Sequence, residues 1–528
     1  MGNKPPSTQS KAGRVTVRRT SCARSVLLDQ KGRTLATLFA NADVPVDAAS
    51  VSDAHAFSGI SERVSSMVST RHLPDGAGVL GVALTPDFHR GSGVPVGTVM
   101  ASRGIVFPRS PGGDIGCGVS LVVTDVRAST VDWDDPAIVT SLRSVFFGGR
   151  RDIPTTPQVR QGILLHGLAA LDGVEKLGGL WRGLDGDAVT AAAAASDAGG
   201  SHPARGVEMF ADWLRGSGDG MSHDNQLGSL SGGNHFLEMG VVDGISDRHV
   251  AWDWGLSEGM VTILVHNGSV GFGGMVGDRG CRSAFDLCRS SGLPAGEDGF
   301  HPLPLAGEYG HLGRAYLDGM GMAANFAAVN RLLLGRMALA ALGQALGREV
   351  GGNLLWDAPH NLAWRDPSGD AEGLDGMVHR KGASPAFGES LDMPWGMPVL
   401  IPGSMGDSSW VMRGLGLADA WSSAPHGAGR VLSRGAGRHA GAQLQKQTDE
   451  RMQQLRTGVG DDASAKLRVV GPADMSRMRG DVVKALLASR AEEAPRTYKP
   501  VGPVVDSTCE AGMAARVARL RPLVTVKS

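Results

Sequence analysis

The sequence predicts an α+β fold in which a mixed β-sheet core is surrounded by helices. Short apolar runs rich in β-branched residues end in glycine turns and are typical of buried strands; they lie at 79–84, 261–265 and 399–401. The helical spacing of apolar residues over 315–346 predicts one long helix, or two helices broken near 319–321. We therefore expect strands that deliver side chains into glycine-rich loops, packed against long helical segments.

Composition and charge narrow the class of protein. Glycine makes up 77 of the 528 residues, roughly 15% against a usual level of about 7%, so many tight turns and backbone-lined sites are expected. With 52 basic and 53 acidic residues the net charge is −1, so a nucleic acid would have to bind at a local basic patch. The five cysteines form no Cys-x-x-Cys pair, and the sequence has neither a secretory h-region nor an uninterrupted apolar run of about 18 residues. These features predict a soluble, cytoplasmic protein that does not enter a membrane.

Local composition suggests the domain boundaries. Residues 1–28 carry several Lys and Arg residues and no acidic residue, which favours a disordered basic tail over a transit peptide. Residues 29–528 are expected to form a single domain, in which 155–215 is helix-rich and is either scaffold or a helical insertion. Charged amphipathic helices are expected at 437–456 and 473–489.

A glycine-rich loop at 111–118 presents Asp114 and Cys117 three positions apart. Because glycine lets the backbone approach a bound group closely, the loop suits an ion-binding site. A cysteine in such a turn is also often a small buried side chain, so the loop alone leaves both interpretations open. Asp87 and His89 follow a predicted strand and would share a face on an extended chain, which fits either a site or a surface turn.

Three histidines repeat one context. His235, His266 and His360 each lie at a strand end or a glycine turn, separated by tens of residues. Such positions converge when the strands share a sheet and their ends form one crevice. A single histidine of this kind is more often structural, but three of them, with Asp114 and Cys117, favour a divalent metal site with nitrogen, oxygen and sulfur ligands. The spacing alone does not distinguish zinc, manganese and iron.

His426 differs from the other histidines because Gly427 to Gly429 follow it and Arg430 comes next. This arrangement would let a phosphate approach the imidazole, which suits a covalent nucleophile at phosphorus, although a simple turn explains it equally well. The chain contains no Gly-Lys pair and hence no P-loop, while the backbone of Pro402 to Gly406 is suited to lining phosphates.

Together these segments resemble the RtcB family of GTP-dependent RNA ligases. The family's signature pieces, each weak alone, occur in the same order over about residues 78–527. They are Pro86-Asp87-x-His89-x-Gly91, Asp114-Ile115-Gly116-Cys117-Gly118, Gly233-Asn234-His235-Phe236-x-Glu238, His266-x-Gly268-Ser269, His360-Asn361, Pro402-Gly403-x-Met405-Gly406 and His426-Gly427-Ala428-Gly429-Arg430. Further echoes are Asn330-Arg331, His379 to Ala383 and Tyr498-Lys499. The resemblance implies an RtcB-like fold with a central cleft for metal and nucleotide.

The resemblance also implies an activity. Members of the family join RNA 3′-phosphate or 2′,3′-cyclic phosphate ends to 5′-hydroxyl ends, in tRNA splicing or RNA repair, and need GTP and Mn²⁺. A histidine attacks GTP to form a phosphoramidate, GMP passes to the RNA 3′-phosphate, and the 5′-hydroxyl displaces GMP. Cyclic phosphate ends are first opened by hydrolysis. A monomer is expected, with an archease-type activator as a possible partner.

Residue by residue, the resemblance makes His426 the guanylylated nucleophile. Two Mn²⁺ ions would be held by Asp114, Cys117, His235, His266 and His360, with the Cys117 thiolate between them. Glu238 and Lys527 suit the guanine edge, Asn234 suits a phosphate, and Asp87 is assigned to the RNA steps. The nucleotide-binding set implied is Asn234, His235, Phe236, Leu237, Glu238, His360, Asn361, Pro402, Gly403, Ser404, Met405, Ser409, His426, Gly427, Ala428, Gly429 and Lys527.

One departure from the family pattern bears on function. Val270 stands where the family has Arg in His-x-Gly-Ser-Arg-Gly, and valine supplies neither the charge nor the donors that grip a phosphate. Ser528 replaces the terminal glycine, a smaller change. We expect that guanylylation survives and RNA engagement is altered. The alternatives are an RNA-end guanylyltransferase or hydrolase, and a non-ligating RNA-binding paralogue.

Overall fold

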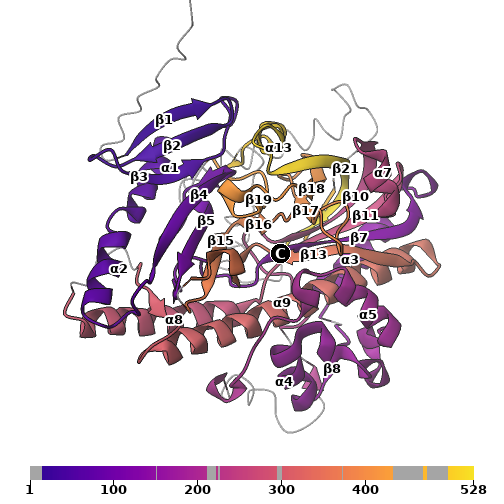
Figure 1. Ribbon diagram of the computed structural model, residues 1–528. Coiled ribbons are helices and arrows are strands. Elements are labelled where there is room, and N and C mark those ends of the chain that lie inside the picture. The colour runs from indigo at the N-terminus through magenta and orange to yellow at the C-terminus, as the bar shows by residue number, and fades with distance from the viewer. Residues whose placement is uncertain are drawn as a thin grey trace, which may run out of the picture.

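The computed structural model describes residues 15–149, 151–210, 222–223, 226–293, 300–371, 373–431, 468–471 and 497–528. In this part of the chain two large β-sheets lie side by side, and the long helices α8 and α9 run beneath them (Figure 1). Most neighbouring strands are antiparallel, but β3 pairs with β4 and β20 pairs with β21 in parallel. The predicted α+β class with mixed sheets is therefore confirmed.

The first sheet has seven strands in the order β1-β2-β3-β4-β5-β15-β14. Their bounds are β1 Thr16–Ser21, β2 Arg24–Leu28, β3 Thr34–Leu38, β4 Gly78–His89, β5 Val96–Arg103, β14 Asn361–Arg365 and β15 Gly376–Lys381. The predicted strand at 79–84 lies within β4, which continues to His89; the strand is buried from Val82 onward, whereas Leu80 is exposed.

The second sheet has eight strands, seven of them in the order β13-β7-β11-β10-β21-β18-β17, with β20 beside β21. Their bounds are β7 Gly118–Arg127, β10 Phe236–Ile245, β11 Met260–Asn267, β13 Gly352–Pro359, β17 Pro398–Ile401, β18 Ser409–Gly414, β20 Arg468–Val470 and β21 Ala514–Val526. Strand β11 contributes to core clusters on both faces of the sheet, with Ile263 on one face and Leu264 on the other. Burial on both faces explains why this strand is continuously apolar in sequence.

Three short strand pairs and nine α-helices complete the described part of the chain. The pairs are β6 Ile105–Val106 with β12 Leu303–Pro304, β8 Pro154–Thr155 with β9 Ser222–His223, and β16 Ala383–Pro385 with β19 Ser423–Pro425. The helices are α1 Ala48–Asp53, α2 Ile60–Ser69, α3 Pro136–Phe147, α4 Pro157–His166, α5 Gly186–Ala194, α7 Arg248–Asp253, α8 Gly271–Ser290, α9 Gly310–Leu346 and α13 Val501–Glu510.

Helix α9 is the central packing element. Its first two thirds belong to one hydrophobic cluster and its last third, from Leu334, to another. It is the one described helix that is long and apolar enough to cross a membrane, but 78% of its most apolar window is buried inside the protein, as expected for a core helix.

The predicted helix at 315–346 is therefore a single helix, and the alternative of a break near 319–321 is wrong. Glycines in this stretch serve close packing instead. A side chain on Gly319 would press on the Phe210 ring, and one on Gly321 would collide with the backbone carbonyl of Pro203. Gly321 thus lets the loop that follows the 197–200 turn cross directly over the helix.

The expectation of a disordered tail over residues 1–28 is wrong for its second half. From Thr16 to Leu28 the chain forms the antiparallel hairpin of β1 and β2. Leu27 is fully buried in the core, and Arg24 forms a 2.6 Å ion pair with Asp419. The positive charges lie on exposed and half-buried positions of the hairpin, so they do not oppose its folding.

The helices expected from the sequence were found only in part. The described part of 155–215 is helical, with α4, α5 and several 3₁₀ turns. Helix α8 was not expected, because its first half is rich in glycine and reads as a turn. The predicted helices at 437–456 and 473–489 lie outside the described residues.

Candidate active site

A cleft of about 820 Å³ lies where loops from both sheets meet. His89 and Lys381 reach it from strands of the first sheet, and His266 reaches it from the second. Most residues of the predicted nucleotide-binding set line it. They are Asn234, His235, Phe236, Glu238, His360, Asn361, Pro402, Gly403, Ser404, Met405, His426, Gly427, Ala428, Gly429 and Lys527.

Two members of the predicted set do not line the cleft. Leu237 lies between Phe236 and Glu238 on β10, so its side chain points to the opposite face, where it is buried in a hydrophobic cluster. Ser409 lies behind Glu238, with its hydroxyl 3.4 Å from the Glu238 carboxylate. Ser409 is thus placed to act on Glu238 and not directly on a ligand.

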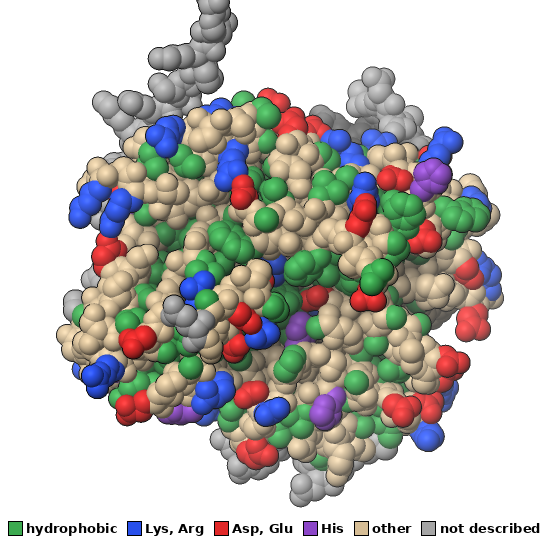
Figure 2. Space-filling model, viewed as in Figure 1, with side chains coloured by type: hydrophobic (Ala, Val, Ile, Leu, Met, Phe, Trp, Pro, Cys, Tyr) green, Lys and Arg blue, Asp and Glu red, His purple; other side chains and the backbone are tan. Residues whose placement is uncertain are grey.

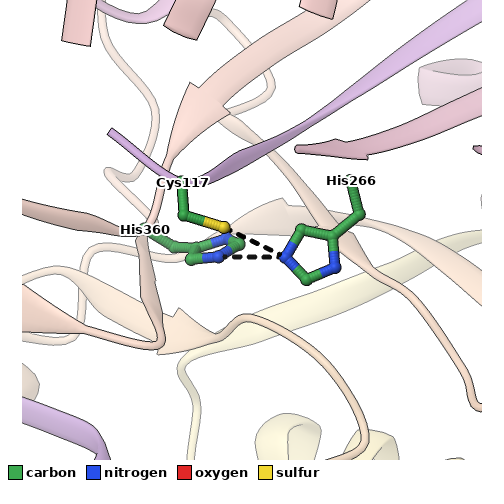
Figure 3. Close-up of side chains that lie close together, drawn as sticks. All are labelled: Cys117, His266 and His360. Atoms are coloured by element: carbon green, nitrogen blue, oxygen red, sulfur yellow. Dashed lines mark hydrogen bonds between the residues drawn. The ribbon is translucent and has the colours of Figure 1, made fainter. Parts of the chain in front are cut away.

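The five predicted metal ligands lie together. The Cys117 sulfur is 3.3 Å from Nε2 of His235 and 3.3 Å from Nε2 of His266. Nε2 of His360 lies 3.3 Å from that of His266, and an Asp114 carboxylate oxygen lies 2.8 Å from Nε2 of His235. Figure 3 shows Cys117, His266 and His360 with their ligating atoms turned toward one another. The atoms form two groups of three that share Cys117.

The register of the second sheet produces this convergence. Strand β7 begins at Gly118, opposite the last residues of its neighbours, Asn267 of β11 and Pro359 of β13. In the same way the first residue of β10, Phe236, pairs with His266. In an antiparallel sheet the start of one strand and the end of the next lie at the same edge, so ligands far apart in sequence meet there.

The protonation of the cluster suits a metal. Burial, followed by the charges of neighbouring histidines, holds the pKa of His266 and of His360 well below the usual value. Burial alone would raise the pKa of Asp114, but the charge of His235 and its hydrogen bond outweigh this and lower it. Neutral imidazoles and an ionised carboxylate are the ligand forms that metals bind.

A hydrogen bond to the backbone fixes the orientation of the His235 imidazole. Nδ1 of His235 lies 2.9 Å from the carbonyl oxygen of Gly232 and can donate to it, so Nε2 is the nitrogen that faces Cys117 and Asp114. Because Nε2 atoms of several imidazoles crowd around one sulfur with few protons to share, the donor set fits two divalent cations that share Cys117.

His426 is held by a buried carboxylate. Its Nδ1 lies 2.6 Å from an Asp87 oxygen, and Asp87 is fully buried. Burial alone would raise the pKa of Asp87, but the charge of His426 and the hydrogen bonds from His426 and Thr85 lower it. With Nδ1 bound to Asp87, Nε2 is the nitrogen left for chemistry, and the ring centroid lies 4.6 Å from that of His360.

The Asp87 segment is not a surface turn. His89 is also buried, and its Nδ1 lies 2.8 Å from the backbone oxygen of Asp87, so it does not compete for the carboxylate. Burial lowers the pKa of His89 to about 3. Gly382, with φ of +61°, lies against the His426 ring; a side chain there would come within 2.9 Å of the ring and displace it.

Glu238 and Lys527 line the end of the cleft formed by β10 and β21. Burial raises the pKa of Glu238 to about 8, although the hydroxyls of Thr525 and Ser409 oppose this. The Lys527 ammonium donates to the backbone oxygens of Gly233 at 2.6 Å and His235 at 3.2 Å. Lys527 therefore also ties down the loop that carries His235.

The residues of the cleft lie within the span of a known family model. A family model described as tRNA-splicing ligase RtcB matches residues 67–468 and 463–528, which together contain all the residues of the cleft. The chain belongs to the RtcB family of RNA ligases. The resemblance drawn from the sequence motifs is thereby confirmed.

Similar RtcB proteins come from archaea and bacteria. The chain is 32% identical to the tRNA-splicing ligase RtcB of Thermococcus kodakarensis over 84% of this chain and 86% of that protein. It is 30% identical to that of Archaeoglobus fulgidus with the same coverage. The RNA-splicing ligase RtcB of Mycobacterium bovis is 32% identical over 84% of this chain and 95% of that protein.

One buried arginine positions the ligands of this RtcB protein. Arg331, on α9, forms an ion pair with Asp357 and donates from Nη1 to the backbone oxygens of Gly116 at 2.8 Å and Asn267 at 3.1 Å. It therefore joins the Cys117 loop to the end of β11. Sequence reasoning noted Asn330-Arg331 only as a family echo, because burial of an arginine is not visible in sequence.

Asn361 also acts on the loops. Its side-chain amide donates to the backbone oxygen of Asp114 at 3.1 Å, and its oxygen accepts from the Gly382 backbone at 2.8 Å. Because Gly382 packs on His426, Asn361 connects the ligand loop with the loop beside the nucleophile. It lines the cleft as predicted, but both ends of its amide are engaged with the protein.

Val270 lines the cleft at the position where the family pattern has arginine. It precedes the first turn of α8 with φ of +56°, a conformation that is a genuine outlier for a β-branched residue. The side chain supplies no hydrogen bond to the helix N-terminus. Position 270 therefore combines backbone strain with the absence of a cation.

The outer surface offers little electrostatic guidance. On the face shown in Figure 2, acidic and basic side chains are interspersed and form no broad region of one sign. This agrees with the net charge of −1. On this face, recognition of a polyanion would depend on cations inside the cleft.

Proposed function

We propose that this protein is a GTP- and Mn²⁺-dependent ligase that joins RNA 3′-phosphate or 2′,3′-cyclic phosphate ends to 5′-hydroxyl ends. The observation that carries the proposal is the placement of His426 between Asp87 and the Cys117 cluster. A histidine fixed through Nδ1 presents a nucleophilic Nε2, as required for a nitrogen–phosphorus bond.

In the first step Nε2 of His426 forms a bond to the α-phosphorus of GTP, and pyrophosphate leaves. Asp87, ionised and buried, holds the proton on Nδ1 and stabilises the positive charge that develops on the ring. Held by Asp114, Cys117, His235, His266 and His360, two Mn²⁺ ions would neutralise the phosphate oxygens and polarise the attacked phosphorus.

The later steps return His426 to its free form. A 3′-phosphate oxygen of RNA attacks the histidine-bound phosphorus, which breaks the nitrogen–phosphorus bond and gives an RNA end activated by GMP. The 5′-hydroxyl oxygen of the second RNA then attacks the 3′-phosphorus, and GMP leaves. A cyclic phosphate end would first be hydrolysed to the 3′-phosphate.

The nucleotide would lie with its base toward Glu238 and its phosphates toward Asn234 and the loop at 402–405. These positions line one continuous cleft with His426. The loops that would hold the phosphates are linked, since the backbone N–H of Ala428 donates to the carbonyl of Pro402 at 3.1 Å. Further parts of the proposal are a monomeric enzyme, a cytoplasmic location and an archease-type activating partner.

Labelling of the protein tests the first step. The full-length protein is incubated with Mn²⁺ and GTP labelled at the α-phosphate, then run on a denaturing gel. We expect an acid-labile label on the wild type, none on His426→Ala, and wild-type labelling of a control variant of the exposed His249, His249→Ala. An unlabelled wild type, or equal label on His426→Ala, would disprove the nucleotidyl-transfer proposal.

Val270 favours a second candidate function, an RNA-end guanylyltransferase or hydrolase that does not complete ligation. Without a cation at this position the RNA phosphate would be held less firmly during the last step. Joining of a 3′-phosphate RNA to a 5′-hydroxyl RNA is compared in the wild type and Val270→Arg. This candidate predicts GMP-capped or hydrolysed ends from the wild type and joined product from the variant. Efficient joining by the wild type would rule it out.

A further inference from the structure

The loop from Pro108 to Asp114 runs along the first three turns of α8. Cβ atoms built on Gly277 and Gly280 would lie 3.8 Å from the Gly112 carbonyl oxygen and 3.1 Å from the Pro108 side chain. The loop therefore packs directly against this face of α8, and a side chain on Gly280 would be crowded by Pro108 and, more severely, by the Tyr316 ring. Gly277 and Gly280 therefore form a helix–loop contact.

Beside this contact the cleft extends along α8, away from the predicted metal ligands. At one end, Gly268 packs on the Asp114 carboxylate. From Val270 to Cys281 the helix advances by about 16 Å. We call the far part of the cleft the α8 arm; it is lined by Pro108, Arg109, Gly112, Gly277, Asp278 and Cys281.

Arg109 is the cation of this arm that lacks a countercharge. Its Nε is buried without a hydrogen-bond partner among the described residues, and it forms no ion pair with them. Its Nη2 lies 3.4 Å from the Ser92 hydroxyl, a long contact to a neutral group, and its other neighbour is the Cys281 thiol. A guanidinium with an unused donor inside a cleft is suited to an anionic ligand.

The loop at 91–95 builds the surroundings of Arg109. Gly93, with φ of +84°, packs directly under the guanidinium, and a Cβ there would come within 2.6 Å of Nε. The same loop accepts two hydrogen bonds from the Lys381 ammonium, through the backbone oxygens of Ser92 at 2.6 Å and Val94 at 2.7 Å. Two cations thus share one loop at the wall of the cleft.

Charges of both signs face the arm. Burial, followed by repulsion from Arg109, lowers the pKa of Lys381 to about 7. Arg90, at the rim, is 3.5 Å from Asp53 and is partly neutralised by it. Asp278 is the acidic residue on the arm itself. An anion bound beside Arg109 would favour the charged form of Lys381, so the two cations would act together.

We propose that the α8 arm binds a phosphodiester of the RNA substrate, with Arg109 as the residue that contacts it. This inference rests on the proposed function and adds the path of the RNA strand and a residue that the family motifs do not contain. Because Val270 leaves the near end of the arm apolar, the strand would be held by a phosphate further from the reacting end.

Glycine on the walls is consistent with this ligand. Gly112, Gly113 and Gly277 expose backbone and leave room for a sugar–phosphate chain. The phosphodiester could belong to the strand that carries the 3′-phosphate or to the strand that carries the 5′-hydroxyl. Because both strands would present the same phosphodiester group to Arg109, the experiment uses one RNA of each kind to distinguish them.

The test measures RNA binding, with no catalytic step. Single-stranded RNAs of about ten nucleotides are used, one with a 3′-phosphate and one with a 5′-hydroxyl and a blocked 3′ end. Their dissociation constants are measured by fluorescence anisotropy at several salt concentrations. The proteins are the wild type, Arg109→Gln, Arg109→Lys and the control Arg289→Gln, whose side chain lies over Phe285 at the other end of α8.

We expect Arg109→Gln to weaken binding of one of the two RNAs about tenfold, the loss of one charge-assisted contact. The slope of log affinity against log salt should fall by about 0.7, the value for one phosphate contact on a single strand. Arg109→Lys should retain the slope, and Arg289→Gln should match the wild type. The RNA that is affected identifies the strand. Asp278→Asn should tighten binding of the same RNA about twofold, since it removes a repulsive charge.

Unchanged affinity and slope in Arg109→Gln, with a melting temperature like that of the wild type, would overturn the inference. If Arg109→Gln fails to fold, wild-type affinity in Asp278→Asn together with a reduced slope in Arg109→Lys would also overturn it. Loss of GTP labelling in Arg109→Gln would assign Arg109 to the nucleotide and would contradict the inference too. A wild type that binds RNA through Arg109 but takes no label from GTP would refute the proposed function alone.

Discussion

The two large sheets contribute different chemistry to one cleft. The second sheet carries Cys117 and His266 at one edge, where strand register sets their positions. The first sheet carries Asp87 near the end of β4, and Asp87 acts on His426 through a side-chain hydrogen bond. The first arrangement is fixed by main-chain pairing and the second by a side-chain contact. Substitutions at Cys117 and at Asp87 should therefore reduce the labelling of His426 to different extents.

The largest effect is expected for Cys117→Ala. It removes the atom shared by both ligand groups, so labelling of His426 by GTP should be abolished while the protein stays folded. Labelling and thermal unfolding are measured together. Cys288→Ala is the matched control, because Cys288 is buried in a hydrophobic cluster; it should lose about 1 kcal/mol of stability and keep its label. Equal labelling of both variants would show that Cys117 is only a core residue.

A smaller effect is expected for Asp87→Asn. The variant keeps the size of the side chain but removes the charge that holds the Nδ1 proton of His426. The rate of labelling in a single turnover should fall about 10²- to 10⁴-fold, with the label still reaching completion. A labelling rate within about threefold of the wild type would mean that Asp87 does not orient His426. The first sheet would then contribute nothing to the nucleophile, contrary to the comparison above.

The smallest effect concerns the pH dependence of stability. The pKa of Glu238 is raised to about 8 in the folded protein, so the folded state binds a proton more tightly than the unfolded state. This contribution to stability is complete below the unfolded pKa of about 4.3 and is lost as pH rises to about 8. Glu238→Gln should remove the effect: its melting temperature relative to the wild type should rise by a few degrees between pH 5 and pH 8. A constant difference would contradict the buried, protonated state.

Strands β11 and β17 of the second sheet could be predicted because their burial leaves a continuous apolar run. The convergence of His266 and His360 could be predicted because each follows an apolar run that ends at the same edge. The β1–β2 hairpin was missed because its exposed basic side chains dominate the composition of a short segment. Helix α8 was missed because tertiary contact overrides the low helix propensity of glycine, as at Gly280 under Tyr316.

Positioning groups of the site were harder to predict than ligands. Asp87 and His426 are 339 positions apart, and no local pattern links them. The role of Arg331 depends on three partners contributed by separate segments, which only the fold brings together. Ligand motifs are local and leave a trace in sequence, whereas contacts between segments do not. Sequence reasoning therefore identified Asp87 but gave it no partner.

His360 lies at the point where the chain passes from one large sheet to the other. It is the one residue between β13, in the second sheet, and β14, in the first. Its backbone N–H donates to the Cys117 carbonyl at 2.7 Å, while its imidazole faces the ligand cluster. Ions bound by His360 and the rest of the cluster would therefore link the two sheets. Because a bound ion stabilises the folded arrangement that holds it, metal loading should also raise the resistance to proteolysis where the two sheets meet.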